Sequence, residues 1–296
     1  MNKWRQRLAT WDAQQDLYRP DRERGLRAMS DVLASALPIE HPRVLDLACG
    51  CGAVTDRILD AVPSARIIGI DRDPVLLRIA REIWTGDPRV TFEQADLRDG
   101  AWRDRHGNGR FDAVVSLGAW EHFCSLEEYQ AGRQEEIYRE IFRRVAGLLP
   151  PGGRFYLQTM VFGRNMIRPE QIDLNAPRDS DAYYVALMMK RFPGSWLPFG
   201  QEQLARTAAP VFRLVTRSSG RLDYIETIRQ WRLRFAAPSA RKTLLKLSLL
   251  PRYLFSADFR LAFTSGVSAN TVCFQRELLD HFRMVFEKVE PTTATP

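Results

Sequence analysis

Short apolar runs alternate with amphipathic stretches between residues 43 and 160. The apolar runs have the length and composition of buried strands, and the stretches between them carry apolar residues at helical spacing. Four prolines and glycines at 150–153 end the last of these helices. The order predicts parallel strands joined by right-handed helical crossovers, which is a Rossmann-like, doubly wound α/β sheet. The expected strands are Arg43–Leu47, Arg66–Ile70, Val90–Gln94, Phe111–Leu117 and Arg154–Thr159, and the expected helices are Val54–Val62, Val75–Trp84 and Tyr138–Leu149.

The alternation of apolar runs and amphipathic stretches ends after Met160. Residues 165–181 are polar and contain proline, and helical segments with aromatic and basic residues follow to about Ser265. A last apolar run, Phe282–Val289, is expected to return to the sheet as an edge strand, before a frayed tail. We therefore divide the chain into a core (1–160), a mainly helical, Arg-rich substrate-binding insertion (161–265) and a return to the core sheet with the C-terminal tail (266–296).

Composition changes this picture little. The chain has 296 residues, of which 45% are hydrophobic, and it shows neither an apolar signal core at its N-terminus nor an apolar stretch long enough to span a bilayer. We expect a soluble, cytoplasmic protein. The spacing of the four cysteines suits neither a zinc knuckle nor a redox pair, so free thiols and no bound metal are expected.

The net charge of +7 is placed unevenly, because residues 201–260 contain twelve Lys and Arg against four Asp and Glu. Such a local excess indicates an anionic partner, and a merely solvated basic face is the alternative. The segment 241–250 mixes cations with leucines, as in helices that rest on a membrane surface, although an ordinary packed helix has the same pattern. Peripheral membrane contact and a homo-oligomer are both compatible with the sequence.

The first strand leads into a candidate cofactor site. It contains Asp46, and the turn 48–52 that follows has glycine where the backbone must bend tightly and let a ligand approach. The third glycine of a dinucleotide-binding turn is replaced by Thr55, so a zwitterionic amino acid fits better than a pyrophosphate. Asp71 ends the second strand, where its two oxygens suit the hydroxyls of a ribose, and Asp96 is placed to accept from an adenine amino group.

In this order, the residues resemble the S-adenosylmethionine motifs of class I methyltransferases, from about Arg43 to Met160. The resemblance implies that S-adenosylmethionine is the cofactor. It also implies that the turn holds the methionine portion, the second strand the ribose, and Asp96 the adenine. The residues expected to bind the cofactor are Asp46, Ala48, Gly50, Gly52, Asp71, Arg72, Asp96 and Leu97.

The fourth expected strand ends in a glycine turn followed by Trp120, Glu121 and His122. Chemistry in such sheets lies at the carboxyl ends of the strands, so these residues are the first catalytic candidates. The asparagine-proline-proline-aromatic signature of enzymes that methylate nucleic-acid bases is absent here. We therefore expect no nucleic-acid partner.

Two further motifs lie in the insertion: Arg191-Phe192-Pro193-Gly194-Ser195-Trp196-Leu197-Pro198 and the segment Asp223–Phe235, which contains Tyr224 and Trp231. Their order and spacing resemble the cyclopropane-fatty-acid synthase family, which includes mycolic-acid methyltransferases. In that family a cysteine, a glutamate, a histidine and a tyrosine hold the bicarbonate that removes a proton. The resemblance matches Glu121 and Tyr224 to the glutamate and tyrosine, but the histidine falls at Gln158 and the cysteine near Leu33.

Half of the bicarbonate cradle is therefore missing, which favours methylation followed by direct loss of a proton. An alkene would attack the sulfonium methyl, and aromatic faces with a carboxylate would stabilise the resulting carbocation. Glu121 would accept the proton, and His122 would orient it. The residues expected at the substrate are Trp120, Gln158, Phe192, Trp196, Tyr224 and Trp231, and Tyr224 is also counted as catalytic.

The leading hypothesis is thus C-methylation of an alkene in an isoprenoid or lipid-like, anionic substrate such as an isoprenyl diphosphate. The alternatives are N-methylation of a small amine and formation of a cyclopropane in a fatty acid or phospholipid. A regulatory or scaffold protein with a degenerate site is a third alternative, against which the complete set of acidic residues at the expected positions counts.

Overall fold

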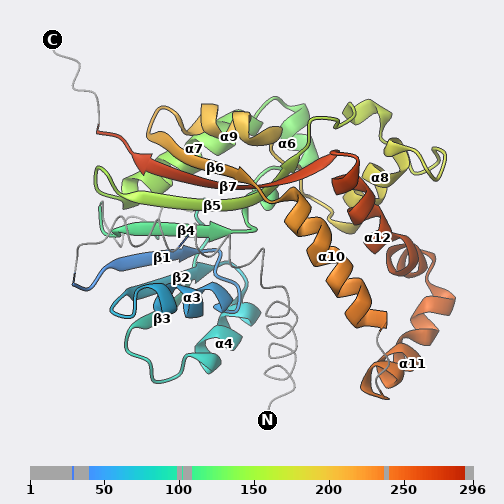
Figure 1. The fold of residues 1–296 in the computed structure, drawn as a ribbon, viewed down its shortest axis with the longest axis horizontal. Coiled ribbons are helices and arrows are strands. Elements are labelled where there is room, and N and C mark those ends of the chain that lie inside the picture. The colour runs from blue at the N-terminus through green and yellow to red at the C-terminus, as the bar shows by residue number, and fades with distance from the viewer. Residues whose placement is uncertain (1–28, 30–39, 99–101, 103–108, 237–239, 291–296) are drawn as a thin grey trace.

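A computed structural model of the chain describes residues 29, 40–98, 102, 109–236 and 240–290. In this part of the chain a seven-stranded sheet has the order β3-β2-β1-β4-β5-β7-β6 (Figure 1). Strands β1 to β5 are parallel, and β7 runs antiparallel to both β5 and β6. The strands are β1 (Arg43–Leu47), β2 (Arg66–Asp71), β3 (Val90–Gln94), β4 (Ala113–Leu117), β5 (Arg154–Phe162), β6 (Phe212–Ser219) and β7 (Leu279–Lys288).

The doubly wound sheet predicted from the sequence is confirmed. The chain moves outward from β1 to β2 and β3, then returns across β1 to continue with β4 and β5. This reversal opens a crevice between the carboxyl ends of β1 and β4, where ligands bind in such sheets. The residues of β1 and β4 that face either side are almost all buried, as expected for central parallel strands.

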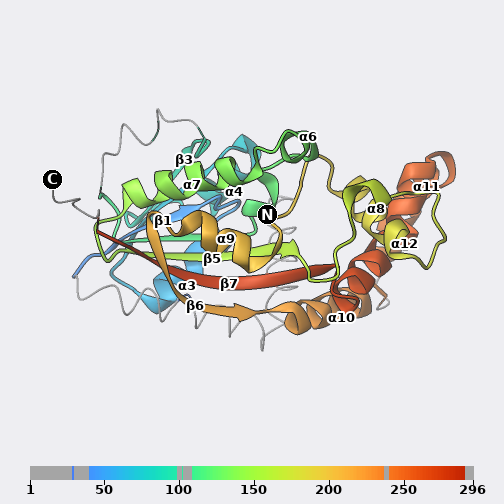
Figure 2. The same ribbon diagram turned by 90° about the horizontal axis from the view of Figure 1, so that it is seen from above.

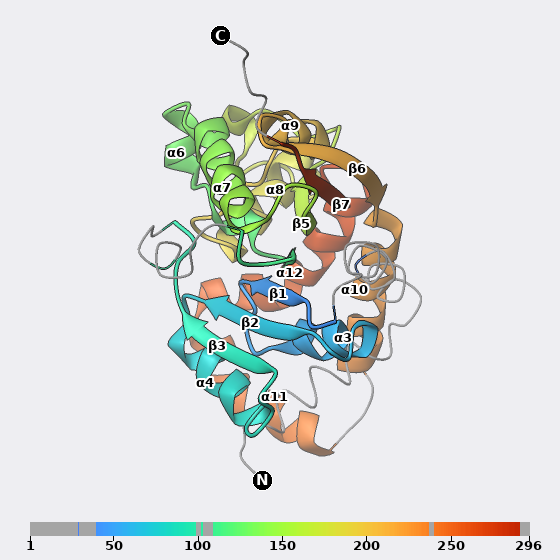
Figure 3. The ribbon, with the colours of Figure 1, turned by 90° about the vertical axis from the view of Figure 1, so that its left-hand side faces the viewer.

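Helices cover both faces of the sheet. One face packs against α3 (Ala53–Ala61) and α4 (Pro74–Ile83), and the other against α7 (Gln134–Leu148) and α9 (Gly200–Ala208) (Figure 3). Three of these helices begin and end within a few residues of the expected bounds, because their apolar residues recur at helical spacing. The short elements η1 (Trp120–His122), α6 (Leu126–Gln130) and η2 (Pro169–Gln171) lie in the connections.

Strand β6 was not predicted. Only Phe212 of this strand is buried, and most of its other residues are exposed and polar, so the sequence shows no strand pattern. The strand exists because β7 offers a free edge with which it pairs over Phe212–Ser219. Together with α9, it lies inside the range 161–265 that was expected to be a helical insertion, so the chain returns to the sheet earlier than expected.

The rest of that range forms a helical arm beyond the carboxyl ends of the parallel strands (Figures 1 and 2). Tight packing of α8 and α10 against α12, around a buried cluster of Tyr183, Trp196 and Phe274, holds the arm together. Across the described residues, no helix combines the length and apolarity that crossing a bilayer requires. The arm consists of α8 (Asp181–Arg191), α10 (Arg221–Ala236), α11 (Ala240–Phe255) and α12 (Ala257–Gln275).

Candidate active site

The turn after β1 presents bare backbone to the crevice. Ala48, Gly50 and Gly52 all have positive φ, of 58°, 55° and 79°. A Cβ on Gly52 would lie 2.9 Å from Cζ of Phe92, so a larger residue there would displace the packing beneath the turn. The turn therefore leaves room for a ligand to approach its main chain closely.

Asp71, at the end of β2, fixes this turn. Its Oδ2 accepts a hydrogen bond of 2.9 Å from the nitrogen of Gly50, and its Oδ1 accepts one of 2.8 Å from the nitrogen of Asp73. Each carboxylate oxygen has more than one lone-pair direction, so both remain able to accept from ribose hydroxyls. The predicted ribose ligand is thus also the residue that shapes the methionine turn.

Asp46 is buried in β1 beneath the turn, with 1% of its surface exposed. Burial raises the pKa of its carboxyl group to about 7, a hydrogen bond from Thr55 opposes this, and the charge of Asp71 adds to it. A bound ammonium group nearby would restore ionisation, because an opposite charge favours the charged form. Asp46 and Gly52 do not line the cavity described next, so a role for them at the cofactor stays a prediction.

A cavity of about 290 Å³ opens between the turn, the ends of β2 and β3, and η1. Arg98 holds the carboxylate of Asp96 there: burial raises the pKa of Asp96, but the hydrogen bonds and charge of Arg98, with that of Arg72, lower it by more. The lining residues are Leu47, Ala48, Gly50, Ile70, Asp71, Arg72, Leu76, Ala95, Asp96, Leu97, Arg98, Gly118, Ala119, His122 and Phe123. Six predicted cofactor residues therefore gather in one cavity.

These residues fit S-adenosylmethionine. The cavity combines a bare main-chain turn, carboxylates at two successive strand ends, and apolar walls that suit an adenine ring. The two acidic side chains in the lining can accept hydrogen bonds from an ammonium group, a ribose or an adenine amine. When bound, the cofactor supplies an electrophilic methyl group.

Glu121 lies in η1, directly after β4, with 7% of its surface exposed. Its Oε1 accepts a hydrogen bond of 2.7 Å from the nitrogen of Met160 in β5. Its Oε2 is buried and has no hydrogen-bond partner among the residues that the structure describes. Burial raises the pKa of this carboxyl group to about 6, and hydrogen bonds from the main chain of Met160 and the side chain of Thr159 oppose the rise. Oε1 is thus fixed by the main chain. Glu121 does not line the cavity, so contact of its Oε2 with a substrate stays a prediction.

His122 is the predicted catalytic residue that reaches the cavity itself. Its Nδ1 lies 2.7 Å from Oγ of Ser195, in the motif that follows α8. Burial and the charge of Arg72 lower the pKa of its imidazole, so the ring is neutral at neutral pH. The contact with Ser195 ties the cofactor cavity to the helical arm.

Tyr224 of α10 is brought close to Glu121 by the fold. Burial raises the pKa of its phenol to about 12, a hydrogen bond with Asn270 lowers it, and the charge of Glu121 raises it. The ring lies tilted against those of Phe274 and His281, with centroids 4.7 Å and 5.4 Å away. The two residues matched to the synthase family therefore lie within electrostatic range of each other.

Sequence reasoning missed His281 and Asn270. His281 lies on β7 opposite Met160, and burial lowers the pKa of its imidazole to about 4, with the charge of Asp223 opposing this. Its Nδ1 and the Oδ1 of Asn270 are buried, without hydrogen-bond partners among the described residues. No local motif marks either residue, because only the pairing of β7 with β5 and the packing of α12 place them here.

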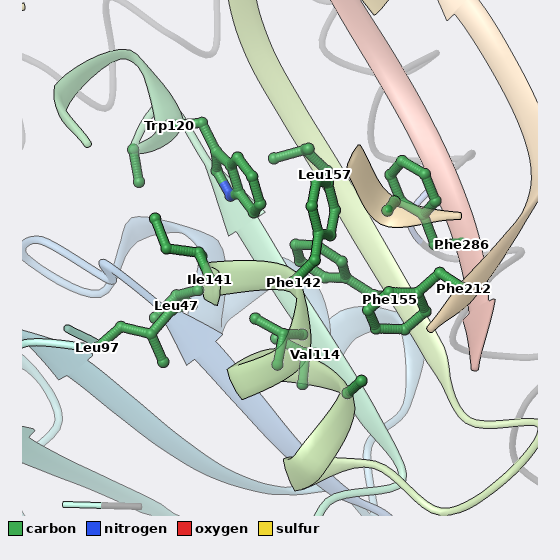
Figure 4. Close-up of a cluster of buried hydrophobic side chains, with 14 of the residues drawn as sticks. Leu47, Leu97, Val114, Trp120, Ile141, Phe142, Phe155, Leu157, Phe212 and Phe286 are labelled. Atoms are coloured by element: carbon green, nitrogen blue, oxygen red, sulfur yellow. The ribbon is translucent and has the colours of Figure 1, made fainter. Parts of the chain in front are cut away.

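Several aromatic candidates lie elsewhere than expected. Trp120 is fully buried between the sheet and α7, with its ring 4.4 Å from that of Phe142 (Figure 4). Trp196 is also fully buried, stacked at 4.9 Å on Tyr129. Both rings pack in hydrophobic cores and do not line the cavity, whereas His122 of the same turn does. A direct role for these two rings at the substrate is therefore not supported.

The other substrate candidates are scattered. Phe192 ends α8 with 44% of its surface exposed, and Gln158 accepts a hydrogen bond of 2.9 Å from the hydroxyl of Tyr156. Leu33 and the side chain of Trp231 lie outside the described residues. For Phe192 and Gln158, contact with a substrate stays a prediction.

Among the side chains that the structure describes, five arginines of the basic segment 201–260 are paired with glutamates, which places their charges along the surface of α9, β6 and α10. These pairs are Arg206–Glu135, Arg213–Glu287, Arg217–Glu202, Arg221–Glu277 and Arg229–Glu226. Arg191, at the end of α8, instead lies close enough to Tyr224 for its charge to lower the pKa of that phenol.

Comparison with known proteins agrees with the assignment of the cavity to S-adenosylmethionine. Residues 44–153 match a family model described as a methyltransferase domain. A trans-aconitate 2-methyltransferase from Azoarcus sp. (strain BH72) is 39% identical over 95 residues, which are 32% of this chain and 35% of that protein. The chain thus spans about a third of the length of this curated relative.

Solved structures extend the likeness in fold to most of the chain. A cyclopropane synthase from Mycobacterium tuberculosis superimposes with a TM-score of 0.63 at 18% identity, covering 88% of this chain and 83% of that one. The geranyl diphosphate C-methyltransferase from Streptomyces coelicolor A3(2) gives a TM-score of 0.57 at 12% identity, covering 89% and 80%. At this identity the likeness concerns the fold, including the helical arm. The predictions of a class I methyltransferase fold and of S-adenosylmethionine as cofactor are confirmed.

Proposed function

We propose that this chain, which contains a methyltransferase domain of the class I fold, transfers the methyl group of S-adenosylmethionine to an alkene carbon of an anionic, isoprenoid or lipid-like substrate. The observation that carries the proposal is the state of Glu121. Its Oε1 is fixed by Met160, while its buried Oε2 has no partner among the described residues. A carboxylate in this state suits a proton acceptor next to a cation.

In the proposed reaction the π electrons of the alkene attack the methyl carbon, and the bond from that carbon to sulfur breaks. The neighbouring carbon is left cationic, and the demethylated cofactor leaves as a neutral thioether. Glu121 takes a proton from the carbon next to the cation, and the electrons of that C–H bond form a new alkene. The methyl group thus replaces a hydrogen, and the released proton resides on the carboxyl group.

The surroundings of Glu121 support such a cation. The buried rings of Tyr224 and Phe274 offer π faces on the arm side of the site. The neutral His281 beside them adds no competing positive charge. His122 lies on the cofactor side, where its neutral ring contacts Ser195 and holds the arm over the cavity.

An anionic group on the substrate would be held by Arg191 rather than by the paired arginines of α9, β6 and α10. Arg191 lies near Tyr224 at an exposed end of α8, where an anion can remain hydrated while an apolar tail lies inside. Guanidinium groups bind phosphate and carboxylate through charge-assisted hydrogen bonds. A diphosphate or carboxylate of an extended apolar substrate fits this arrangement.

The test is turnover with labelled S-adenosylmethionine and matched pairs of substrates. We expect transfer to geranyl diphosphate or a related isoprenyl diphosphate, and at least tenfold lower kcat/KM for the corresponding alcohol, since one charge-assisted contact is worth about 1.5–3 kcal/mol. Equal turnover of the alcohol and the diphosphate would contradict the anion site. Labelled product from small amines alone would contradict alkene chemistry.

N-methylation of an amine is the second candidate, because the same Glu121 with Asn270 offers buried acceptor atoms to an ammonium group. The two reactions differ in what Glu121 must do. An amine attacks through its own neutral nitrogen lone pair, so Glu121 would only help to bind it, and substituting Glu121 should mainly raise KM. Alkene methylation needs a base after methyl transfer, so the same substitution should lower kcat.

A further inference from the structure

The apolar side chains of α11 lie largely in solvent. Leu244 has 68% of its surface exposed, Leu247 58%, Leu250 47%, Leu254 56% and Phe255 88%. These five belong to one helix of 16 residues, whereas the remaining exposed large apolar side chains of the described residues are spread over other elements. Contiguous exposed apolar surface of this kind marks a docking site.

The spacing places them together on one side of the helix. Leu244, Leu247 and Leu254 stand at positions i, i+3 and i+10, which fall on one stripe of an α-helix, and Pro251 lies on the same stripe. Helix α11 packs on α12. Figure 1 shows α11 at the far tip of the helical arm, and Figure 2 shows it at the same extremity. The stripe is therefore free to meet a flat surface.

The charge of this segment indicates what that surface is. Between Glu226 and Asp258 the sequence contains no acidic residue, while Arg241, Lys242, Lys246 and Arg252 lie in α11 itself. A second copy docking through the same face would bring two cationic helices together, which costs free energy. An anionic bilayer surface instead attracts the cations and accepts the leucines.

We propose that α11 docks this protein onto an anionic membrane surface, with the helix lying in the plane of the lipid headgroups. The stripe of Leu244, Leu247 and Leu254 enters the boundary between headgroups and acyl chains, and the cations contact lipid phosphates. The other end of the arm carries Tyr224 and Asn270. The proposal concerns the location of the protein and does not depend on which atom is methylated.

Co-sedimentation of the purified full chain with vesicles tests the proposal. We expect binding to vesicles of phosphatidylcholine mixed with phosphatidylglycerol, at least tenfold weaker binding to phosphatidylcholine alone, and weakening by added salt. The variant L244S/L247S/L254S should bind the mixed vesicles at least tenfold more weakly. The matched control I83S/L174S/V215S removes three apolar side chains of 41%, 39% and 40% exposure outside α11 and should bind like the native chain.

Circular dichroism and cofactor calorimetry establish that each variant is folded. If the triple variant is not folded, the single change Leu247→Asp takes its place. Failure of the native chain to bind mixed vesicles overturns the proposal, as does equal binding by the folded α11 variant. Sedimentation velocity tests whether a second copy of the chain covers the stripe instead. A native dimer that becomes a monomer in the α11 variant would assign the stripe to that second copy and overturn membrane docking.

Discussion

Oε1 of Glu121 lies 2.7 Å from the main-chain nitrogen of Met160, and this bond joins the turn after β4 to the neighbouring strand β5. Met160 in turn pairs with His281 of β7, and the imidazole ring of His281 lies tilted against the ring of Tyr224. The carboxylate is thus held by the sheet on one side and faces the arm on the other. Its position does not depend on a flexible loop, which is what a proton acceptor for a short-lived cation requires.

Glu121→Gln should lower turnover by about 10²-fold or more while leaving cofactor affinity unchanged. The amide keeps the volume and still accepts from Met160, but it lacks the negative charge and the base. Single-turnover rates and calorimetric titration with the demethylated cofactor separate the two effects. The control Glu128→Gln changes a carboxylate that caps α6 and pairs with Arg133 but does not line the cavity, and its turnover should be near normal. Near-normal turnover of Glu121→Gln would remove the carboxylate from the chemistry.

The rate of methyl transfer should depend on the ionisation of Glu121. Burial raises its pKa to about 6, and a base acts only when deprotonated. At saturating cofactor and substrate, kcat should therefore rise with pH up to about 6 and level off above it, and the Glu121→Gln variant should lack this limb. A stopped-flow pH series on both proteins checks the expectation. A flat native profile between pH 5 and 7 would argue against it.

Asp71→Ala should weaken binding of S-adenosylmethionine at least tenfold. The change removes the predicted acceptor of the ribose hydroxyls and also the hydrogen bond that holds Gly50 in the turn after β1. Asp73→Ala is the matched control, because Asp73 only caps α4 through its bonds to Val75 and Leu76. The control should lose about 1 kcal/mol of stability and keep its cofactor affinity. Equal affinities for native protein and Asp71→Ala by calorimetry would contradict the ribose assignment.

Asp46→Asn should stabilise the ligand-free protein and weaken cofactor binding. The pKa of Asp46 is raised from 3.8 to about 7, so its contribution to stability is complete below about pH 4 and is lost as pH rises through 7. At pH 8 the variant should exceed the native protein by about 2 kcal/mol, and the difference should vanish near pH 4. Urea unfolding at both pH values measures it. If the variant were less stable than the native protein at pH 8, burial would not be raising the pKa of the Asp46 carboxyl group.

Asp223→Asn should destabilise the protein by about 3 kcal/mol, because it removes the negative charge that faces the buried guanidinium of Arg283. The pair joins α10 to β7, with 14% and 5% of the two side chains exposed. Adding Arg283→Met should recover at least half of the loss, since replacing both charges avoids the unpaired one. Urea unfolding of the two variants compares them. Equal losses in the single and double variants would show that the ion pair is not the cause.

The central sheet and the residues that line the cavity followed from local sequence. Buried parallel strands are continuous apolar runs, and the turn after β1 needs small residues with positive φ. Consecutive residues therefore predict both the strand bounds and the turn. Asp71 and Asp96 were predicted to lie together because each stands at or just beyond the end of a strand, and the carboxyl ends of parallel strands share one edge; both line the cavity. The catalytic role of Glu121 rests on the same reasoning and stays a prediction.

Only the tertiary structure decided the rest. Strand β6 exists through its partner β7, since an edge strand buries little and carries no apolar alternation. Trp120 lies in the hydrophobic core while His122 of the same short helix lines the cavity, and the spacing of residues along the sequence does not reveal which of them faces the ligand. His281 and Asn270 reach Tyr224 from elements more than forty residues away, and contacts of that range depend on how helices and strands pack rather than on any motif.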